Sequence, residues 1–184
     1  MNLATTADPR LDGRAVRRIV YDEAAIAQRV HELGEAITAE YADGPLLVLG
    51  LLKGSFIFVS DLVRQIRRPL QVDFVVASSY GTAMASSGDV QMVYDPETDL
   101  EGKHILLAED IVDSGRTIAV LWDVLSKRKP RSLAICALLH KHLAEHLQHP
   151  VRYVGFDAPN EFLVGYGLDH AEDFRHLPYI ASLK

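Results

Sequence analysis

Cysteine is nearly absent from this chain. The single cysteine, Cys136, lies inside the apolar run SLAICALL, so an intramolecular disulfide is impossible and a buried structural thiol is the expected role. A protein without disulfides fits a reducing compartment. The cysteine content therefore excludes the class of disulfide-stapled secreted domains.

Long apolar runs are also missing. No stretch approaches the roughly 18 uninterrupted apolar residues that span a membrane, and the first eighteen residues, MNLATTADPRLDGRAVRR, contain no apolar segment typical of a signal peptide. We therefore expect a cytoplasmic protein without a membrane partner. We also expect these eighteen residues to be weakly ordered.

An excess of positive charge is the third absence. The formal net charge is −6, and the basic residues cluster only in the short patches RRP and KRKP. Nucleic-acid binding requires a basic face. We expect no nucleic-acid partner and interpret both patches as solvated.

What the chain does contain is enough apolar sequence for one core. With 184 residues, 48% of them hydrophobic, residues 1–184 are expected to form a single domain. The apolar periodicity predicts helices at 23–42, 55–67 and 115–127, strands at 46–51, 71–77, 103–108, 132–138 and 151–156, and a short helix between the last two strands. This alternation predicts an α/β fold with a mostly parallel central sheet flanked by helices.

Ligands of open α/β sheets bind where the carboxyl ends of strands run into loops. Three loops meet this condition: LKGS at 52–55, the Ser- and Gly-rich segment 78–90, and EDIVDSGRT at 109–117. In the third, free N–H groups at a helix start near Ser114 suit a phosphate. The alternative is that Asp113 or Ser114 only caps the helix.

The acidic residues of this third loop conflict with a phosphate site taken alone. Glu109, Asp110 and Asp113 would repel an anion, so they should instead face a cation or a hydroxyl proton. Adjacent residues of a strand point to opposite faces, so Glu109 and Asp110 can serve equally only if the strand has ended before them. We expect both to contribute; the alternative is that one is mainly structural.

The string LLAEDIVDSGRT resembles the 5-phosphoribosyl-1-pyrophosphate (PRPP) motif of type I phosphoribosyltransferases. LLKGS, SSYG, the lysine of LLHKH and FLVGYGLDHAEDFR narrow the resemblance to hypoxanthine and hypoxanthine-guanine phosphoribosyltransferases, and the match runs in order from about residue 46 to residue 175. The resemblance implies the type I phosphoribosyltransferase fold, with a small hood drawn mainly from about 157–184 and from residues near the N-terminus. It also implies that the Leu52–Lys53 bond is, or becomes, cis.

The implied reaction transfers the 5-phosphoribosyl group of PRPP to N9 of a 6-oxopurine, hypoxanthine or guanine, and releases pyrophosphate. The implied cofactor is Mg²⁺, and the implied assembly is a homodimer or homotetramer. The loop at 78–90 would then be a lid that excludes water from the reacting carbon; the alternative is an ordinary surface loop.

The resemblance assigns a role to each matched residue. The residues expected to bind PRPP and its phosphates are Lys53, Gly54, Ser79, Tyr80, Glu109, Asp110, Ser114, Gly115, Arg116, Thr117 and Arg175. The purine would be bound by Lys141 at the exocyclic oxygen, by stacking on Phe162 and by the backbone of Leu163. Asp113 would be the catalytic base, and the metal would be held by Asp169, Glu109 and Asp110, the last two directly or through water.

Three alternatives stand beside this interpretation. HLAEH at 142–146, with His140 and His149 nearby, matches the H-x-x-E-H zinc pattern, although a five-residue match is weak evidence without structural context. A non-catalytic PRPP-binding regulator that binds RNA would need a basic surface, which the composition does not favour. The third alternative is an enzyme of the same fold for another base, such as xanthine or orotate; the combination of Lys141 and Phe162 favours a 6-oxopurine.

Overall fold

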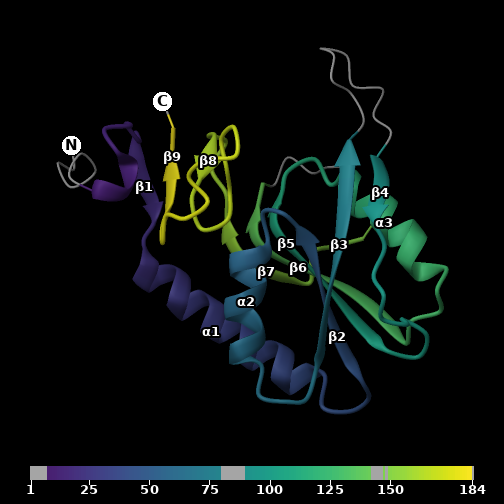
Figure 1. Ribbon diagram of the computed structural model, residues 1–184. Helices are drawn as coiled ribbons and strands as arrows, with labels where there is room; N and C mark the ends of the chain where they lie inside the picture. The colour runs from purple at the N-terminus through teal and green to yellow at the C-terminus, as the bar shows by residue number, and fades with distance from the viewer. Residues whose placement is uncertain (1–7, 80–89, 142–146, 148, 184) are drawn as a thin grey trace.

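The computed structural model describes residues 8–79, 90–141, 147 and 149–183. In this part of the chain, three α-helices accompany a six-stranded sheet and a three-stranded sheet (Figure 1). Among the described residues, none of the helices is both long enough and apolar enough to cross a membrane.

The central sheet has the strand order β4-β3-β2-β5-β6-β7. Its strands are β2 Leu46–Leu52, β3 Gln71–Ser79, β4 Val90–Tyr94, β5 His104–Val112, β6 Ser132–His140 and β7 Tyr153–Asp157. All neighbouring pairs are parallel except β3 and β4 at one edge. The mostly parallel α/β sheet is confirmed, whereas β4 was not predicted, because its residues lie partly within the polar loop.

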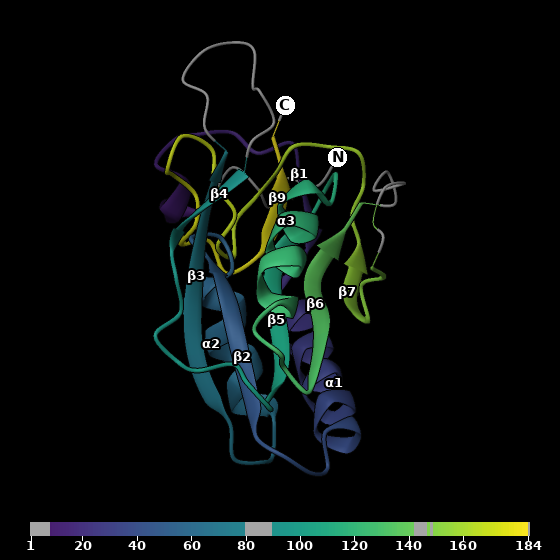
Figure 2. The ribbon, with the colours of Figure 1, turned by 90° about the vertical axis from the view of Figure 1, so that its right-hand side faces the viewer.

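Helices cover both faces of this sheet (Figure 2). On β2, Leu46 and Val48 belong to the core under α1 Glu23–Glu40 and α2 Phe56–Gln65, while the alternating leucines of the same strand pack toward α3 Arg116–Ser126. This alternation is the period-2 geometry of a strand buried on both faces. Cys136 lies fully buried in the first core, and burial raises the pKa of its thiol, as expected for a structural cysteine.

The amphipathic helix α1 starts and packs as its sequence predicts. The side chain of Asp22 accepts a hydrogen bond from the backbone N–H of Ala25 at 2.8 Å, which caps the helix. The predicted apolar stripe of the helix is buried against the sheet and α2; its members are Ile26, Val30, Leu33 and Ile37.

A small antiparallel sheet forms the hood. Its order is β1-β9-β8, with β1 Arg18–Tyr21, β8 Leu163–Val164 and β9 Ile180–Ser182. Figure 1 shows these strands, from the purple and yellow ends of the chain, side by side at one end of the central sheet. The hood therefore combines the C-terminal segment with residues near the N-terminus, as predicted.

Residues 8–18 belong to the segment that the sequence predicts to be weakly ordered. Residues Pro9–Leu11 form a short 3₁₀ helix capped by Asp8, and Leu11 and Val16 are buried in the core of the hood. These two apolar residues anchor a segment whose overall composition is polar. Residues 1–7 lie outside the described part of the chain.

Candidate active site

The turn that follows β5 forms a small cradle at the start of α3. Gly115 has a left-handed backbone with φ of 77°, and the helix begins at Arg116. Backbone N–H groups in a first helical turn have no partner within the helix and attract anions. A cavity of about 100 Å³ lies here, and its lining includes Glu109, Ser114, Gly115, Arg116 and Thr117. All four predicted phosphate-binding residues of the turn are thus brought together beside two acidic residues, Glu109 and Asp113.

Strand β5 does not end at residue 108 as predicted, but continues to Val112. Its parallel ladder with β6 continues through Glu109 opposite Ala137 and Val112 opposite His140, so backbone pairing carries the strand past its polar side chains. The two acidic side chains have different surroundings. Glu109 lines the cradle cavity, whereas Asp110 packs against the backbone of the loop after β2.

Burial is the main electrostatic influence on this carboxylate pair. It raises the pKa of Glu109 well above the ordinary value, with a further contribution from the neighbouring Asp110 carboxylate, and it also raises the pKa of Asp110. Within the described residues, Oε2 of Glu109 is buried without a hydrogen-bond partner. A buried carboxylate oxygen is costly when unpaired, so the pair is suited to a ligand that brings donors or a cation.

The acidic residues also fit a Mg²⁺ site of a particular kind. Mg²⁺ prefers oxygen ligands and is usually held by one or two carboxylates together with substrate phosphates and water. Residues 8–79, 90–141, 147 and 149–183 contain no group of three or more His, Cys, Asp or Glu side chains placed to hold a metal. The orphaned oxygen of Glu109 therefore suits a metal that arrives with its phosphate substrate better than a metal held in an all-protein cage.

The LKGS loop makes a close contact with β5. The Leu52–Lys53 peptide bond is cis, as expected. A Cβ on Gly54 would lie 1.8 Å from Oδ2 of Asp110, and a Cβ on Gly167 of the hood would lie 2.1 Å from the carbonyl oxygen of Gly54. Only glycine allows this approach, which brings the LKGS loop, the acidic end of β5 and the hood together.

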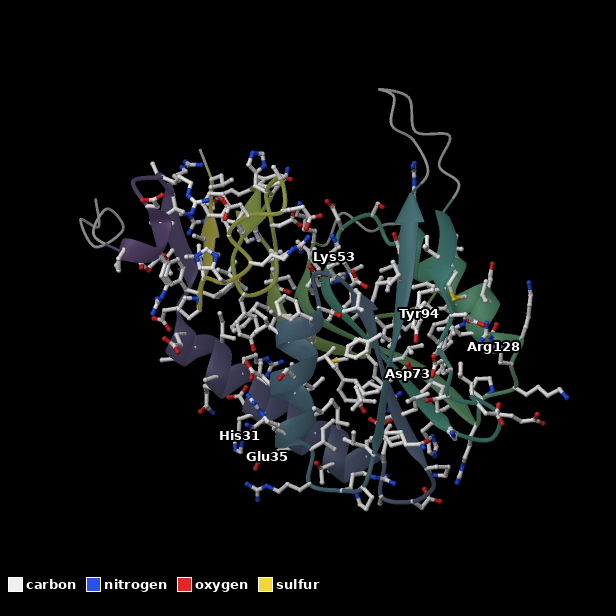
Figure 3. The ribbon with its side chains drawn as sticks, viewed as in Figure 1. His31, Glu35, Lys53, Asp73, Tyr94 and Arg128 are labelled. Atoms are coloured by element: carbon white, nitrogen blue, oxygen red, sulfur yellow. The ribbon has the colours of Figure 1, made fainter. Side chains whose placement is uncertain are left out.

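The predicted cations of the site lie on the hood side of this loop. Figure 3 places Lys53 at the end of β2 nearest the hood, far from His31 and Glu35 on α1. Arg175 donates from Nη1 to the carbonyl oxygen of Gly167 at 2.7 Å and pairs through Nη2 with Oδ1 of Asp169 at 2.8 Å. The predicted metal ligand Asp169 is therefore already paired with a predicted phosphate ligand.

The predicted purine-binding residues are divided between the end of β6 and the hood. Nζ of Lys141 donates to Oδ2 of Asp113 at 3.1 Å, and the lysine side chain is only 15% exposed. Phe162 is 56% exposed and meets the ring of His170 edge-on at 5.3 Å. The side chain of Leu163 is buried, so only its backbone is free to meet a ligand.

Some predicted features fall outside the described residues. Tyr80, the rest of the lid at 80–89 and the HLAEH motif at 142–146 are among them, and of Ser79 only its place at the end of β3 is known. His149, named as a neighbour of the zinc pattern, stacks on Trp122 with ring centroids 3.9 Å apart.

Sequence reasoning missed two features of the site. The first is Glu172, which contacts both Lys53 and Arg175. The second is the pairing of Asp113 with Lys141. It follows from the register, because Val112 and His140 lie opposite each other at the ends of β5 and β6, and Asp113 and Lys141 are the next residues of the chain. The register between β5 and β6 would have predicted this pair, but the sequence alone does not give it.

Comparison with known proteins decides the family. A family model described as a phosphoribosyl transferase domain matches residues 17–171.

This chain belongs to the phosphoribosyltransferase family.

The relatives of this phosphoribosyltransferase carry consistent names. The hypoxanthine phosphoribosyltransferase of Salmonella typhimurium is 45% identical over 167 residues, which cover 90% of this chain and 94% of the relative. The hypoxanthine-guanine phosphoribosyltransferase of Dictyostelium discoideum is 47% identical over 172 residues, which cover 91% and 96%. A crystal structure of a hypoxanthine phosphoribosyltransferase from Staphylococcus aureus aligns with a TM-score of 0.87 at 40% identity and covers 92% of each chain.

Proposed function

We propose that this phosphoribosyltransferase serves purine salvage by transferring the 5-phosphoribosyl group of PRPP to N9 of hypoxanthine and of guanine. The products are IMP or GMP and pyrophosphate. The observation that carries the proposal is the end of β5, where the carboxylates of Glu109 and Asp110 lead directly into a phosphate cradle and then into the Asp113–Lys141 pair. The names of the Salmonella and Dictyostelium relatives support hypoxanthine and guanine as the bases.

PRPP would be held along this strand end. The backbone and hydroxyl groups of Ser114–Thr117 would bind the 5-phosphate, while Glu109 and Asp110 accept hydrogen bonds from the ribose hydroxyls. Lys53 and Arg175 would bind the pyrophosphate group; the planar guanidinium of Arg175 suits two phosphate oxygens. Because the net charge of the chain is −6, local cations must attract this polyanionic substrate. In the proposed closed state, Ser79 and Tyr80 complete the site.

Mg²⁺ is the proposed cofactor, and when bound it would lower the cost of separating the negatively charged leaving group. Asp169, Glu109 and Asp110 would hold it, the last two directly or through water. The pairing of Asp169 with Arg175 leaves lone pairs on its carboxylate, so binding does not require this ion pair to break.

The Asp113–Lys141 pair matches one edge of a 6-oxopurine. This edge presents an acceptor, the 6-oxo group, beside N7, whose proton must leave as N9 attacks. Lys141 would donate to the oxygen and Asp113 would take the proton as general base. The half-exposed ring of Phe162 would stack on the purine, and the backbone of Leu163 would bind its other edge. The 6-amino group of adenine offers no acceptor to Lys141, so we expect adenine to be a poor substrate.

Assembly and location stay predictions. We propose a homodimer or homotetramer, which sedimentation at assay concentration would test, and a cytoplasmic location, which cell fractionation would test.

The function is tested by measuring nucleotide formation from PRPP with hypoxanthine, guanine, xanthine, adenine and orotate. We expect turnover with hypoxanthine and guanine and little with adenine. A preference for xanthine or orotate would favour the enzyme for another base, and no product with any base would favour the non-catalytic regulator. A transition-metal chelator added under saturating Mg²⁺ should leave activity unchanged; loss of activity would support the zinc interpretation instead.

A further inference from the structure

Glu172 lies between the two cations that the proposed function assigns to pyrophosphate. Its Oε1 is 3.2 Å from Nζ of Lys53, and its Oε2 is 3.2 Å from Nη2 of Arg175. Each carboxylate oxygen therefore contacts a different cation. This arrangement resembles the way two oxygens of a phosphate group would be shared between the same two side chains.

The backbone directs Glu172 to this position. His170 and Asp173 exchange backbone hydrogen bonds at 3.2 and 3.1 Å, which closes a tight turn. The two central residues, Ala171 and Glu172, have φ values of 53° and 67°, as in a type I′ turn. Positive φ is uncommon for residues other than glycine, asparagine and aspartate, and such residues persist where the surrounding structure requires them.

A second contact stabilises the turn. The backbone N–H of Glu172 donates to Oδ2 of Asp169 at 2.9 Å, and Oδ1 of the same carboxylate pairs with Arg175. The carboxylate of Glu172 is thereby tied to the residues of the proposed pyrophosphate site through its own backbone as well as through its side chain.

The two ion pairs of Glu172 can be displaced by a stronger anion. The side chains of Glu172 and Lys53 are 65% and 69% exposed, whereas Arg175 is 18% exposed and also pairs with Asp169. In both pairs the Glu172 carboxylate is exposed to water, and ion pairs screened by water are individually weak. Pyrophosphate carries more negative charge than one carboxylate, so it would displace Glu172 from both Lys53 and Arg175.

We propose that Glu172 is an internal counter-anion, which occupies the cations of the pyrophosphate site in the free protein and returns to them as pyrophosphate leaves. The inference rests on the proposed function. Glu172 weakens the binding of PRPP and pyrophosphate by competition. At product release it gives Lys53 a carboxylate partner and gives Arg175 a second one beside Asp169. It is a residue that acts through the two cations, not a group that touches the reacting atoms.

The test is Glu172→Gln, which keeps the size of the side chain and removes its charge. Calorimetry with Mg²⁺ and pyrophosphate should give a dissociation constant about twofold to tenfold lower than in wild type, the range expected when two weak ion pairs no longer compete. The KM for PRPP and the inhibition constant of pyrophosphate should fall by a similar factor. These changes should shrink at high salt.

The matched control is Glu101→Gln. Glu101 is also 65% exposed and pairs with a lysine, Lys129, but it precedes β5 at the opposite end of the strand from the site. We expect no change in pyrophosphate binding for this variant.

The direction of the change separates the possible roles. Weaker pyrophosphate binding in Glu172→Gln would mean that Glu172 positions the cations instead of competing for them, and unchanged binding would mean that it does neither; both results would overturn the inference. Failure of the function is read separately, from the absence of nucleotide product in wild type with every base.

Discussion

The two halves of strand β5 share one backbone ladder and differ in everything that their side chains do. The residues from Ile105 to Ala108 are apolar and fully buried, and they connect the cores on both faces of the sheet. From Glu109 onward the strand keeps its pairing with β6, but it carries the half-buried carboxylate of Glu109 and the buried one of Asp110, and it leads into Asp113. The comparison teaches that hydrogen-bonded pairing sets the position of this strand, while the side chains decide whether a segment stabilises the fold or forms the site.

The apolar half of β5 stabilises the folded state, whereas the polar half from Glu109 onward destabilises it. Burial of apolar side chains stabilises the folded state by about 25 cal/mol per Å² of surface removed from water. Burial of Glu109 and Asp110 acts in the other direction, since it raises the pKa of both by disfavouring their charged forms. The site can keep these groups because the apolar half and the two helical layers hold the strand in place.

The largest effect should come from Asp113→Asn. Asparagine cannot accept the N7 proton, so kcat should fall about 10²- to 10⁴-fold, the usual contribution of general base catalysis, with PRPP affinity and stability nearly unchanged. Single-turnover kinetics with PRPP and hypoxanthine measure the chemical step. Asp95→Asn is the control, because Asp95 is similarly exposed and also pairs with a cation, Arg128. Full single-turnover activity in Asp113→Asn would remove Asp113 as the base.

In the apolar half of β5, Leu106→Ala should lower stability and leave substrate binding nearly unchanged, the opposite of Asp113→Asn. Leu106 is fully buried, so truncation should destabilise the protein by about 2–5 kcal/mol through lost burial and a cavity, while the KM values of the folded protein stay near wild type. Urea denaturation followed by circular dichroism measures the loss. If the substitution changed KM for PRPP more than it changed stability, the two halves would not be separable.

Lys141→Gln tests whether Lys141 binds the purine and not PRPP. Loss of a charged donor to the 6-oxo group should raise the KM for hypoxanthine about tenfold to a hundredfold and leave the affinity for PRPP nearly unchanged. Initial rates with each substrate varied in turn give both values. Equal weakening of both substrates would show that Lys141 acts on the whole site through its pairing with Asp113.

The sequence was sufficient for most of the fold because the apolar pattern repeats in segments of ordinary length. The stripe of Ile26, Val30, Leu33 and Ile37 predicted α1, and the runs that are apolar on both faces predicted the parallel sheet. The extension of β5 past residue 108 was missed. The predicted strand ended where the polar residues Glu109 and Asp110 begin, but backbone pairing with β6 does not depend on side-chain polarity.

For the site, local motifs located the residues but not their partners. The phosphate cradle follows from the local sequence 113–117, whereas the Asp113–Lys141 pair depends on the register between β5 and β6. Glu172 was missed for a different reason: its role arises from a turn with positive φ at Ala171 and Glu172, and neither residue type predicts such a turn.

The most direct test of the account is Glu109→Gln, with stability and activity measured on the same preparation. In wild type, the raised pKa of Glu109 means that stability is retained below the ordinary pKa of 4.5 and falls as pH rises through the raised value. Glutamine has no proton to lose, so the variant should be more stable than wild type at neutral pH, by an amount that grows with pH and vanishes in acid.

The same variant should lose activity. Without the charged acceptor for the ribose hydroxyls, kcat/KM for PRPP should fall about tenfold to a hundredfold. A variant that is more stable at neutral pH and less active is the predicted result. A variant that is less stable at neutral pH, or that keeps full activity, would contradict the claim that the polar half of β5 gives up stability for chemistry.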